Sequence, residues 1–286
     1  MIIYKTIEGL KNSLYKAKTQ GKKIGFVPTM GALHTGHLSL LEISKKENDL
    51  TLCSIFINPS QFNNQDDFIK YPITTENDIL LLEKISTDIL FLPSLEEMNT
   101  LKSHASFNLD GMDQILEGLH RPGHFQGVCE IVEKLLRIIH PDFLYLGEKD
   151  FQQCLVLKKL ITILQLDTKI KICPILRSPS GLALSSRNQR LSETGLLHAA
   201  NIFKVLSNIK TQLTTGNWQT LKETSIKNLL NNGFEKVDYL EMCDTDSLQI
   251  LDEAPEKREV VILIAAFIEG VRLIDNIKTT ANILTN

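Results

Sequence analysis

The first 175 residues of the chain alternate between short apolar runs and segments with helical spacing. Five of the runs are predicted to be strands. Because they are apolar almost throughout instead of alternating, both faces of each strand must be covered. Such strands, separated by helical segments, are typical of a parallel sheet with helices on both sides. The predicted strands are 24–30, 50–57, 88–92, 142–146 and 169–175, and helices are predicted over 128–139 and 152–166.

After about residue 176 the pattern changes. Two predicted helices, 193–213 and 218–231, precede predicted strands near 235–242, 259–268 and 271–277, and these strands follow one another without helices between them. Residues 260–268 form the longest apolar run, which is too short to cross a bilayer and fits a buried strand. The sequence therefore predicts an α/β protein: a Rossmann-like parallel-sheet domain over 1–175 and a smaller C-terminal α+β domain over 176–286.

Charge and cysteine content exclude several classes of protein. The formal net charge is -3 with a pI of about 6.2, which argues against a nucleic-acid partner because such binding needs a basic surface. The first 20 residues carry four lysines and no long apolar core, so they do not form a secretory signal. Five scattered cysteines without a CxxC pair indicate buried free thiols and a reducing cytoplasm. No membrane partner is expected.

Two histidines, His34 and His37, lie in a glycine-containing turn directly after the first predicted strand. In an open α/β sheet, ligands bind beyond the carboxyl ends of the strands. Gly31 and Gly36 allow a sharp turn and a close approach to a ligand. A helix beginning near Gly36 would direct its N–H groups and the positive end of its dipole at that ligand. The histidines could be metal ligands, buried structural residues or donors to an anion, and the order strand, turn, histidine pair and helix favours a phosphate.

A second candidate for phosphate binding lies at the predicted domain boundary. The segment Leu184-Ser185-Ser186-Arg187 offers two hydroxyl groups and a guanidinium, and a guanidinium can bind an oxyanion through two nitrogens. Taken alone, the same segment could equally be a solvated serine-rich linker.

Polar residues also follow the second and fourth predicted strands. Asn58 and Gln61 come after the second strand, and Gln153 comes after the fourth. An amide both donates and accepts, so these residues suit a small hydroxy acid, although each could be a surface amide. Between the fourth strand and Gln153, Lys149 can reach a phosphate and Asp150 can bind ribose hydroxyls, unless they only form a charged helix terminus. Arg121 and His124 could bind an anion or stabilise their loop.

At this point a family resemblance is clear. HTGH (34–37) resembles the HIGH signature of the nucleotidyltransferase superfamily, and LSSR (184–187) resembles its KMSKS-type loop with Arg in the last place. More closely, the chain resembles the pantoate–β-alanine ligase family, and its C-terminal third does so less distinctly. The stretches that carry the resemblance are PTMGALHTGHLSL (28–40), FINPSQF (56–62), YPIT (71–74), RPGHFQGV (121–128), PDFLYLGEKDFQQ (141–153) and GLALSSRNQRLS (181–192).

The resemblance implies roles for individual residues. Gln61 and Gln153 would hold pantoate, with Asn58 near, and Gln61 would also lie near β-alanine. His37 would be a proton donor. The implied catalytic residues are His34, His37, Lys149 and Arg187, and the implied ATP-binding residues are Met30, Gly31, Ala32, Leu33, His34, Thr35, Gly36, His37, Gly147, Glu148, Lys149, Asp150, Leu176, Leu184, Ser185, Ser186 and Arg187.

Mg²⁺ is expected to accompany the phosphates of ATP. Asp78, which follows YPIT, could help to hold this metal ion. The family often has a second acidic residue directly before this position, where the present chain has Asn77. No tightly bound organic cofactor is expected.

The resemblance implies an AMP-forming ligase, EC 6.3.2.1. It would condense (R)-pantoate with β-alanine to pantothenate through a pantoyl adenylate, with ATP as a substrate and AMP and pyrophosphate as products. It also implies a homodimer formed through the N-terminal domain, with residues 176–286 acting as a lid. Two other functions stay open from the residues: a nucleotidyltransferase that keeps its nucleotidyl product, and a nucleotide-sensing module without turnover.

Overall fold

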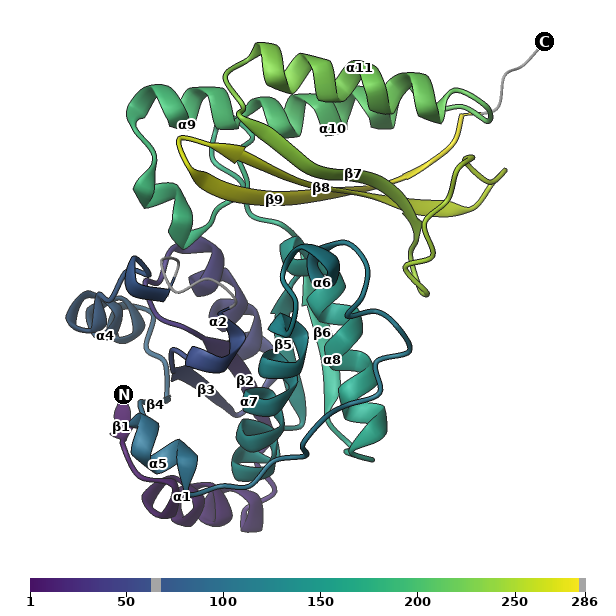
Figure 1. The fold of residues 1–286 in the computed structure, drawn as a ribbon. Helices are drawn as coiled ribbons and strands as arrows, with labels where there is room; N and C mark the ends of the chain where they lie inside the picture. Colours follow the sequence, from purple (N-terminus) through teal and green to yellow (C-terminus); the bar gives the residue numbers. More distant parts are fainter. Residues whose placement is uncertain (63–67, 283–286) are drawn as a thin grey trace. The chain divides into compact units, whose positions relative to one another are not determined.

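The computed structural model describes residues 1–62 and 68–282 (Figure 1). The chain divides into two compact units. The first comprises Met1–Glu148 and Gln152–Pro174, and the second comprises Lys149–Phe151 with the residues from Ile175 onward. Within the described residues, no helix has the length and apolar character needed to span a membrane.

The first unit contains a six-stranded sheet in which every pair of neighbouring strands is parallel. The strand order is β1-β4-β3-β2-β5-β6, so β2 pairs with β3 on one side and with β5 on the other. This confirms the predicted parallel sheet, and it adds a sixth strand, β1, that the sequence did not predict. The strands are β1 (Ile2–Tyr4), β2 (Ile24–Thr29), β3 (Leu50–Ile55), β4 (Ile89–Phe91), β5 (Phe143–Gly147) and β6 (Lys169–Cys173).

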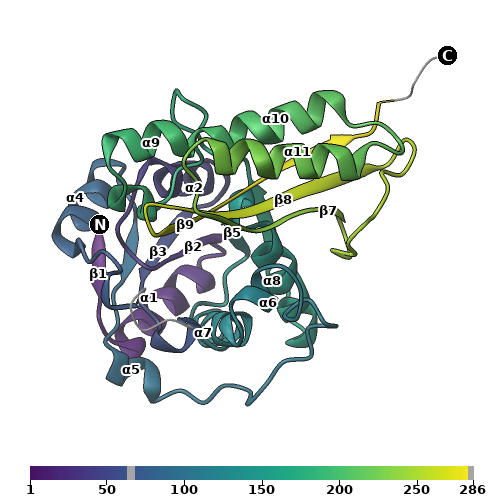
Figure 2. The ribbon, with the colours of Figure 1, turned by 45° about the horizontal axis from the view of Figure 1, so that its top comes forward.

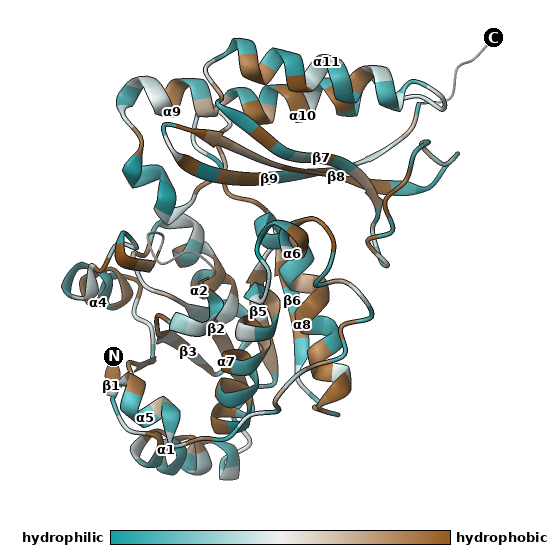
Figure 3. Cartoon of the chain, viewed as in Figure 1, coloured by the Kyte–Doolittle hydropathy of each residue, from teal (hydrophilic) through white to brown (hydrophobic). Residues whose placement is uncertain are grey.

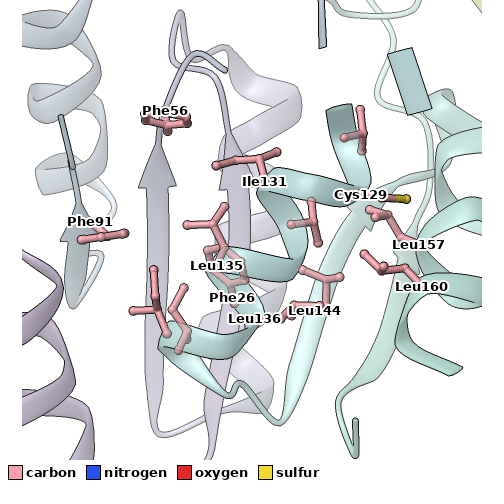
Figure 4. Close-up of a cluster of buried hydrophobic side chains, with 14 of the residues drawn as sticks. Phe26, Phe56, Phe91, Cys129, Ile131, Leu135, Leu136, Leu144, Leu157 and Leu160 are labelled. Carbon is pink, nitrogen blue, oxygen red and sulfur yellow. The ribbon is translucent and has the colours of Figure 1, made fainter. Parts of the chain in front are cut away.

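Helix α7 (His124–Ile139) contributes the largest share of buried helical residues to the core of this unit. Figure 4 shows Leu135 and Leu136 of α7 beside Phe26 of β2 and Leu144 of β5, with all four side chains buried. The other helices are α1 (Ile7–Thr19), α2 (Thr35–Glu47), α4 (Thr75–Lys84), α5 (Leu95–Asn99), α6 (Glu117–His120) and α8 (Phe151–Ile163), with 3-10 turns η1 (Pro59–Gln61) and η2 (Glu148–Asp150).

The second unit is built on a three-stranded antiparallel sheet in the order β7-β8-β9. Helices α10 (Asn201–Gln212) and α11 (Trp218–Asn231) lie side by side along one face of this sheet (Figures 1 and 2). The strands are β7 (Lys236–Asp244), β8 (Glu259–Ile268) and β9 (Val271–Thr280), and η3 (Ser186–Arg190) and α9 (Glu193–Ala199) precede α10. The long apolar run predicted as a buried strand is β8, which Figure 3 draws mostly brown.

One predicted helix, 193–213, is wrong. The segment forms two helices, α9 and α10, that meet at Ala200. The N–H of Ala200 bonds to the carbonyl of His198 instead of the carbonyl four residues earlier, so the regular helical hydrogen bonding is interrupted there. Apolar residues with a helical period occur on both sides of the break, which is why the sequence pattern alone did not show it.

The prediction of free, buried cysteines is confirmed for all five residues. Burial raises the pKa of Cys53, Cys129 and Cys243 to about 12 and that of Cys173 to about 11. These four thiols are therefore protonated at neutral pH and are poor nucleophiles.

The core beneath α7 can be tested by deletion. Leu136 has no exposed side-chain surface, so we expect Leu136→Ala to lower the free energy of unfolding by about 2.5–5 kcal/mol through lost burial and the cavity left behind. Leu119→Ala in α6 is the matched control, because that side chain is 63% exposed and its loss should cost less than about 0.5 kcal/mol. Urea unfolding of both variants provides the measurement, and equal losses would contradict this core.

Candidate nucleotide and substrate site

The carboxyl ends of β2 and β5 form the switch point of the parallel sheet. From β2 the strand order proceeds through β3 to one edge and through β5 to the other, and ligands of open α/β sheets bind where the order reverses in this way. The histidine loop, residues 30–37, follows β2, and Glu148 follows Gly147 at the end of β5. Two of the predicted ATP-binding segments therefore begin at adjacent strand ends.

The backbone of the histidine loop is held by side chains of the protein itself. Gly31 and Ala32 have φ angles of 82° and 48°, a left-handed conformation that is unfavourable for alanine. The N–H of Gly31 donates to Oγ1 of Thr29 at 3.2 Å. The N–H groups of Ala32 and Leu33 donate to the carboxylate of Asp78 at 2.9 and 2.8 Å. The structure thus brings Asp78, the residue predicted to contact a metal, against the loop backbone.

His34 and His37 cap the N-terminus of α2 reciprocally. Nδ1 of His34 accepts the N–H of Gly36 at 3.1 Å, and Nδ1 of His37 accepts the N–H of His34 at 3.3 Å. Because a backbone N–H can only donate, we assign the proton of each neutral ring to Nε2. The ring centroids lie 3.9 Å apart with an interplanar angle of 32°, so two protonated rings would repel each other strongly.

This arrangement changes the expectation that the first N–H groups of α2 would face a ligand. The N–H of Gly36 is occupied by His34, and the N–H of His37 bonds to the carbonyl of His34 at 2.8 Å. The imidazole donors of the pair are the two Nε2–H groups. We therefore expect the imidazoles, more than the Gly36 and His37 amides, to meet an anion at this loop.

Gln61 lies at the carboxyl end of β3 and contacts the histidine loop. Its side chain is 8% exposed, and its Nε2 donates to Sδ of Met30. The neighbouring amide of Asn58 is engaged in holding the turn, because its Nδ2 donates to Oγ of Ser60 at 2.9 Å and to the carbonyl of Gly127 at 3.0 Å. The structure therefore places Met30 and Gln61 together and gives Asn58 a local structural role.

The turn that carries Gln61 is also tied to α7. Arg121 donates from Nη1 to Nε2 of His124 at 3.0 Å, because a guanidinium only donates. Nδ1–H of His124 then donates to the carbonyl of Gln61 at 2.8 Å. At Gly127 a Cβ atom would lie only 2.5 Å from the carbonyl oxygen of Ser60, so glycine is needed for this close packing. Arg121 and His124, whose roles the sequence left open, thus position Gln61.

The structure distinguishes the adjacent residues Gln152 and Gln153. Gln152 is 3% exposed and accepts the N–H of Glu117 while donating to the carbonyls of Met112 and Ile115. Gln153 is half-buried, and no described residue hydrogen-bonds to its side chain. Of this pair, Gln153 is the one whose amide is not bonded to a described residue, and its role in binding a substrate stays a prediction.

The second unit holds the remaining predicted ATP-binding residues. Nζ of Lys149 lies 3.2 Å from Oδ1 of Asp150. The N–H of Leu184 donates to the carbonyl of Leu176 at 3.0 Å, so these two residues are neighbours on a short antiparallel turn. Ser185 caps η3 by accepting the N–H of Arg187 at 3.3 Å, and Ser186 is buried.

Sequence reasoning missed the residues that hold this turn in place. Arg177 donates to both carboxylate oxygens of Asp275 on β9, at 2.5 and 2.9 Å, and to the carbonyl of Gly181 at 3.1 Å. Asn276 in turn donates to the carbonyl of Lys149 at 3.0 Å. Asp275 is 3% exposed, and burial raises its pKa although the Arg177 charge opposes that shift. The partners lie 98 residues apart in the chain, and no local sequence pattern indicates such a pair.

Across residues 1–62 and 68–282, no three His, Cys, Asp or Glu side chains are grouped in a way that would hold a metal ion. The parallel sheet and the histidine-capped loop beyond its switch point define a Rossmann-like α/β protein with a candidate ligand site at the strand ends.

Comparison with known proteins agrees over nearly the whole chain. A family model described as pantoate-beta-alanine ligase matches residues 2–278. A pantothenate synthetase of Cytophaga hutchinsonii is 45% identical over 280 residues, covering 97% of this chain and 99% of the relative. One of Bacteroides fragilis strain YCH46 is 43% identical over 279 residues, with the same coverage.

Solved structures agree with these matches. Pantothenate synthetase from Thermus thermophilus has a TM-score of 0.84 at 32% identity, covering 97% of this chain and 99% of that chain. Pantoate-beta-alanine ligase from Francisella tularensis, complexed with beta-gamma ATP and β-alanine, has a TM-score of 0.81 at 39% identity, covering 97% of each chain. The chain belongs to the pantoate–β-alanine ligase family of enzymes, as its motifs predicted.

The contribution of His34 to stability as the N-cap of α2 can be tested separately from any role in ligand binding. His34→Ala removes the acceptor for the Gly36 N–H and should lower the free energy of unfolding by about 0.5–2 kcal/mol. His34→Asn keeps a strong N-cap acceptor, so its stability should stay within a few tenths of a kcal/mol of the parent. Urea unfolding compares the two variants, and an equal loss in both would show that capping is not what His34 contributes to stability.

Proposed function

We propose that this chain condenses (R)-pantoate with β-alanine in an ATP-dependent reaction that passes through an enzyme-bound pantoyl adenylate. The observation that carries the proposal is the family match over residues 2–278 in a chain whose paired histidines lie beyond the switch point of its sheet. The complex of the Francisella tularensis relative with beta-gamma ATP and β-alanine supports two of the three substrates, and the family name supports the third.

The proposed reaction has two chemical steps. A carboxylate oxygen of pantoate attacks the α-phosphorus of ATP, and the bond from that phosphorus to the β-phosphate bridging oxygen breaks to release pyrophosphate. The amine of β-alanine then attacks the acyl carbon, loses a proton, and displaces AMP with the electrons of the C–O bond. The protein positions the reactants and stabilises charge. No covalent nucleophile is required.

The histidine pair has the geometry for the first step. Its Nδ1 atoms are held as acceptors by backbone N–H groups, which supports Nε2–H as the donor that each ring would offer to the triphosphate. Charge develops on phosphate oxygens as pyrophosphate leaves, and donors that strengthen there lower the barrier. We propose that His37 stabilises the departing group by donating a hydrogen bond from Nε2, with His34 beside it. The proton donation that the family resemblance implies for His37 would require a doubly protonated ring, whose Nδ1 could no longer accept the His34 N–H.

Other residues of the site bind and orient the substrates. We propose that Gln61 and Gln153 hold the hydroxyl and carboxylate groups of pantoate, with Gln61 also near β-alanine, because amides match both donors and acceptors. Lys149 and Arg187 stabilise phosphate charge. The nucleotide is bound by Met30, Gly31, Ala32, Leu33, His34, Thr35, Gly36, His37, Gly147, Glu148, Lys149, Asp150, Leu176, Leu184, Ser185, Ser186 and Arg187.

Further properties follow from the family resemblance as proposals. Mg²⁺ accompanies the phosphates of ATP and neutralises part of their charge. The protein acts in the cytoplasm as a homodimer. Residues 1–175 bind the nucleotide and pantoate, and residues 176–286 form a lid domain that supplies the Leu184–Arg187 segment.

One experiment separates this function from its two alternatives. With the proposed function, exchange of labelled pyrophosphate into ATP requires pantoate, and net formation of AMP requires β-alanine as well. A nucleotidyltransferase that keeps its product would not form AMP in response to β-alanine. A nucleotide-sensing module would show neither reaction. Absence of pantoate-dependent exchange in the parent protein would overturn the proposal.

His37 should matter mainly in the first half-reaction. We expect His37→Ala to slow adenylation by on the order of 100- to 1000-fold, the range for losing one donor to a developing anion. His37→Gln can retain the capping bond to the His34 N–H but cannot replace the imidazole, so it should be equally slow. Single-turnover measurement of each half-reaction, with pantoyl adenylate supplied for the second, tests this.

The exposed residue His198 provides the control for these variants, and His198→Ala should react at the parental rate. Comparable slowing of both half-reactions in His37→Ala would contradict a role tied to pyrophosphate departure. Recovery of the full adenylation rate in His37→Gln would show that His37 acts only by capping α2.

Replacement of Gln61 should affect the binding of pantoate much more than the binding of ATP. We expect Gln61→Ala to weaken pantoate binding by roughly 10- to 100-fold, since lost hydrogen bonds to a charged group cost about 1.5–3 kcal/mol, with a much smaller effect on ATP binding. Gln20→Ala, at an exposed position after α1, is the control. Isothermal titration with each substrate measures both affinities. An equal loss for pantoate and ATP would remove Gln61 from the acid-binding pocket.

A further inference from the structure

Asp78 is a buried carboxylate whose oxygens both face hydrogen-bond donors. It lies in the first turn of α4 with 1% of its surface exposed. Oδ2 accepts the N–H of Ala32, and Oδ1 accepts the N–H of Leu33 together with the hydroxyl of Thr74 at 3.0 Å. A buried carboxylate is tolerated only when donors surround it in this way.

The turn that Asp78 binds needs an anchor. Gly31 and Ala32 are consecutive left-handed residues, and this conformation is strained for alanine. The N–H groups of Ala32 and Leu33 converge on Asp78, which resembles the way a backbone nest binds an anion. A Cβ on Gly31 would lie 3.1 Å from Oδ2 of Asp78 and 3.2 Å from Cγ2 of Ile55, so the carboxylate sits directly against the glycine.

These contacts do not fit a magnesium ligand. Mg²⁺ requires oxygen ligands in near-octahedral geometry and retains several waters. Oδ1 of Asp78 already accepts two donors, and Oδ2 is covered by the Gly31 turn. A cation at either oxygen would also face the positive ends of the Ala32 and Leu33 N–H dipoles. The predicted metal contact of Asp78 therefore disagrees with its surroundings.

We propose that Asp78 is a positioning residue that clamps the Gly31–Leu33 turn and thereby sets the place of the histidine pair relative to the nucleotide. The clamp fills the anion-binding nest of the loop with the protein's own carboxylate. Phosphate groups are then left to the imidazole donors of His34 and His37. The consequence for catalysis rests on the proposed function, whereas the clamp itself is a property of the free protein.

Asp78→Asn tests the clamp, with Glu76→Gln as the matched control. Glu76 lies in the same first turn of α4 and is exposed, so its variant removes the same charge without touching the loop. In the ligand-free protein, amide hydrogen exchange of residues 30–37 should accelerate about tenfold or more in Asp78→Asn and stay unchanged in Glu76→Gln. Unchanged exchange in Asp78→Asn would overturn the clamp.

Kinetics then distinguishes positioning from metal ligation. In pantoate-dependent ATP–pyrophosphate exchange, Asp78→Asn should lower kcat/KM for ATP at saturating Mg²⁺ by about 100-fold, as expected when reacting groups are misplaced by about 1 Å. The Mg²⁺ concentration for half-maximal rate should not change. A raised Mg²⁺ requirement with unaltered amide exchange would make Asp78 a metal ligand and overturn the proposal.

Thr74→Val keeps the test decisive if Asp78→Asn does not fold. It removes only the hydroxyl bond to Oδ1 and should produce smaller changes of the same kind, about two- to fivefold in exchange and in kcat/KM for ATP. Parental values of both in Thr74→Val would then overturn the clamp. If the parent protein shows no pantoate-dependent exchange, the proposed function fails, while the hydrogen-exchange result still decides the clamp.

Discussion

The pairing of β2 with β3 on one side and with β5 on the other determines where every element of the first unit's candidate site can lie. Because all the strands are parallel, the segments after β2, β3 and β5 emerge at one edge of the sheet. Those segments carry the histidine loop, the turn with Gln61 and the residues beginning at Glu148. The contact from Gln61 to Met30 is a direct result, since it joins the ends of two neighbouring strands. Helix α7 fixes the same turn from the side, through His124 and the close approach at Gly127.

At the end of β2, the partners of the backbone N–H groups explain why the chain uses histidines. A glycine-rich loop that binds phosphate usually does so with its own amides. Here Thr29 occupies the amide of Gly31, Asp78 occupies those of Ala32 and Leu33, and His34 occupies that of Gly36. These four amides are therefore not available to an anion, and we expect side chains to supply donors in their place. Backbone amides also hold Nδ1 of each imidazole as an acceptor, so Nε2 carries the proton. Capping and donor orientation are two consequences of one arrangement.

The sequence was informative where a property is local and much less so where it depends on distant partners. Continuous apolar runs identified five strands of the parallel sheet, and helical spacing identified α11 with its observed bounds. The three-residue strand β1 was missed because so short a segment shows no period. Motifs located His34, His37, Gln61 and Gln153, but their spacing could not show that Asp78 binds amides 45 and 46 residues away. Neither could it show that Gln152, beside Gln153, is occupied by the loop before α6.

Two buried carboxylates hold candidate ATP-binding segments, one in each unit. Their hydrogen-bond partners differ in charge. Asp275 faces the guanidinium of Arg177, so the turn from Leu176 to Leu184 is fixed by a pair with no net charge. Asp78 accepts from neutral donors, two amides and a hydroxyl, so none of these three partners carries a charge opposite to that of a carboxylate. A carboxylate at this position repels a phosphate bound at the same loop, and the amide dipoles offset that repulsion only in part. The ring N–H groups of the two histidines lie at Nε2, because their Nδ1 atoms accept backbone N–H groups, so the pair answers this repulsion with hydrogen-bond donors. The buried acid and the half-buried histidines are therefore parts of one arrangement. Asp78 holds the Ala32 and Leu33 amides of the loop, and the amides of His34 and Gly36 determine which ring nitrogen of each histidine can donate.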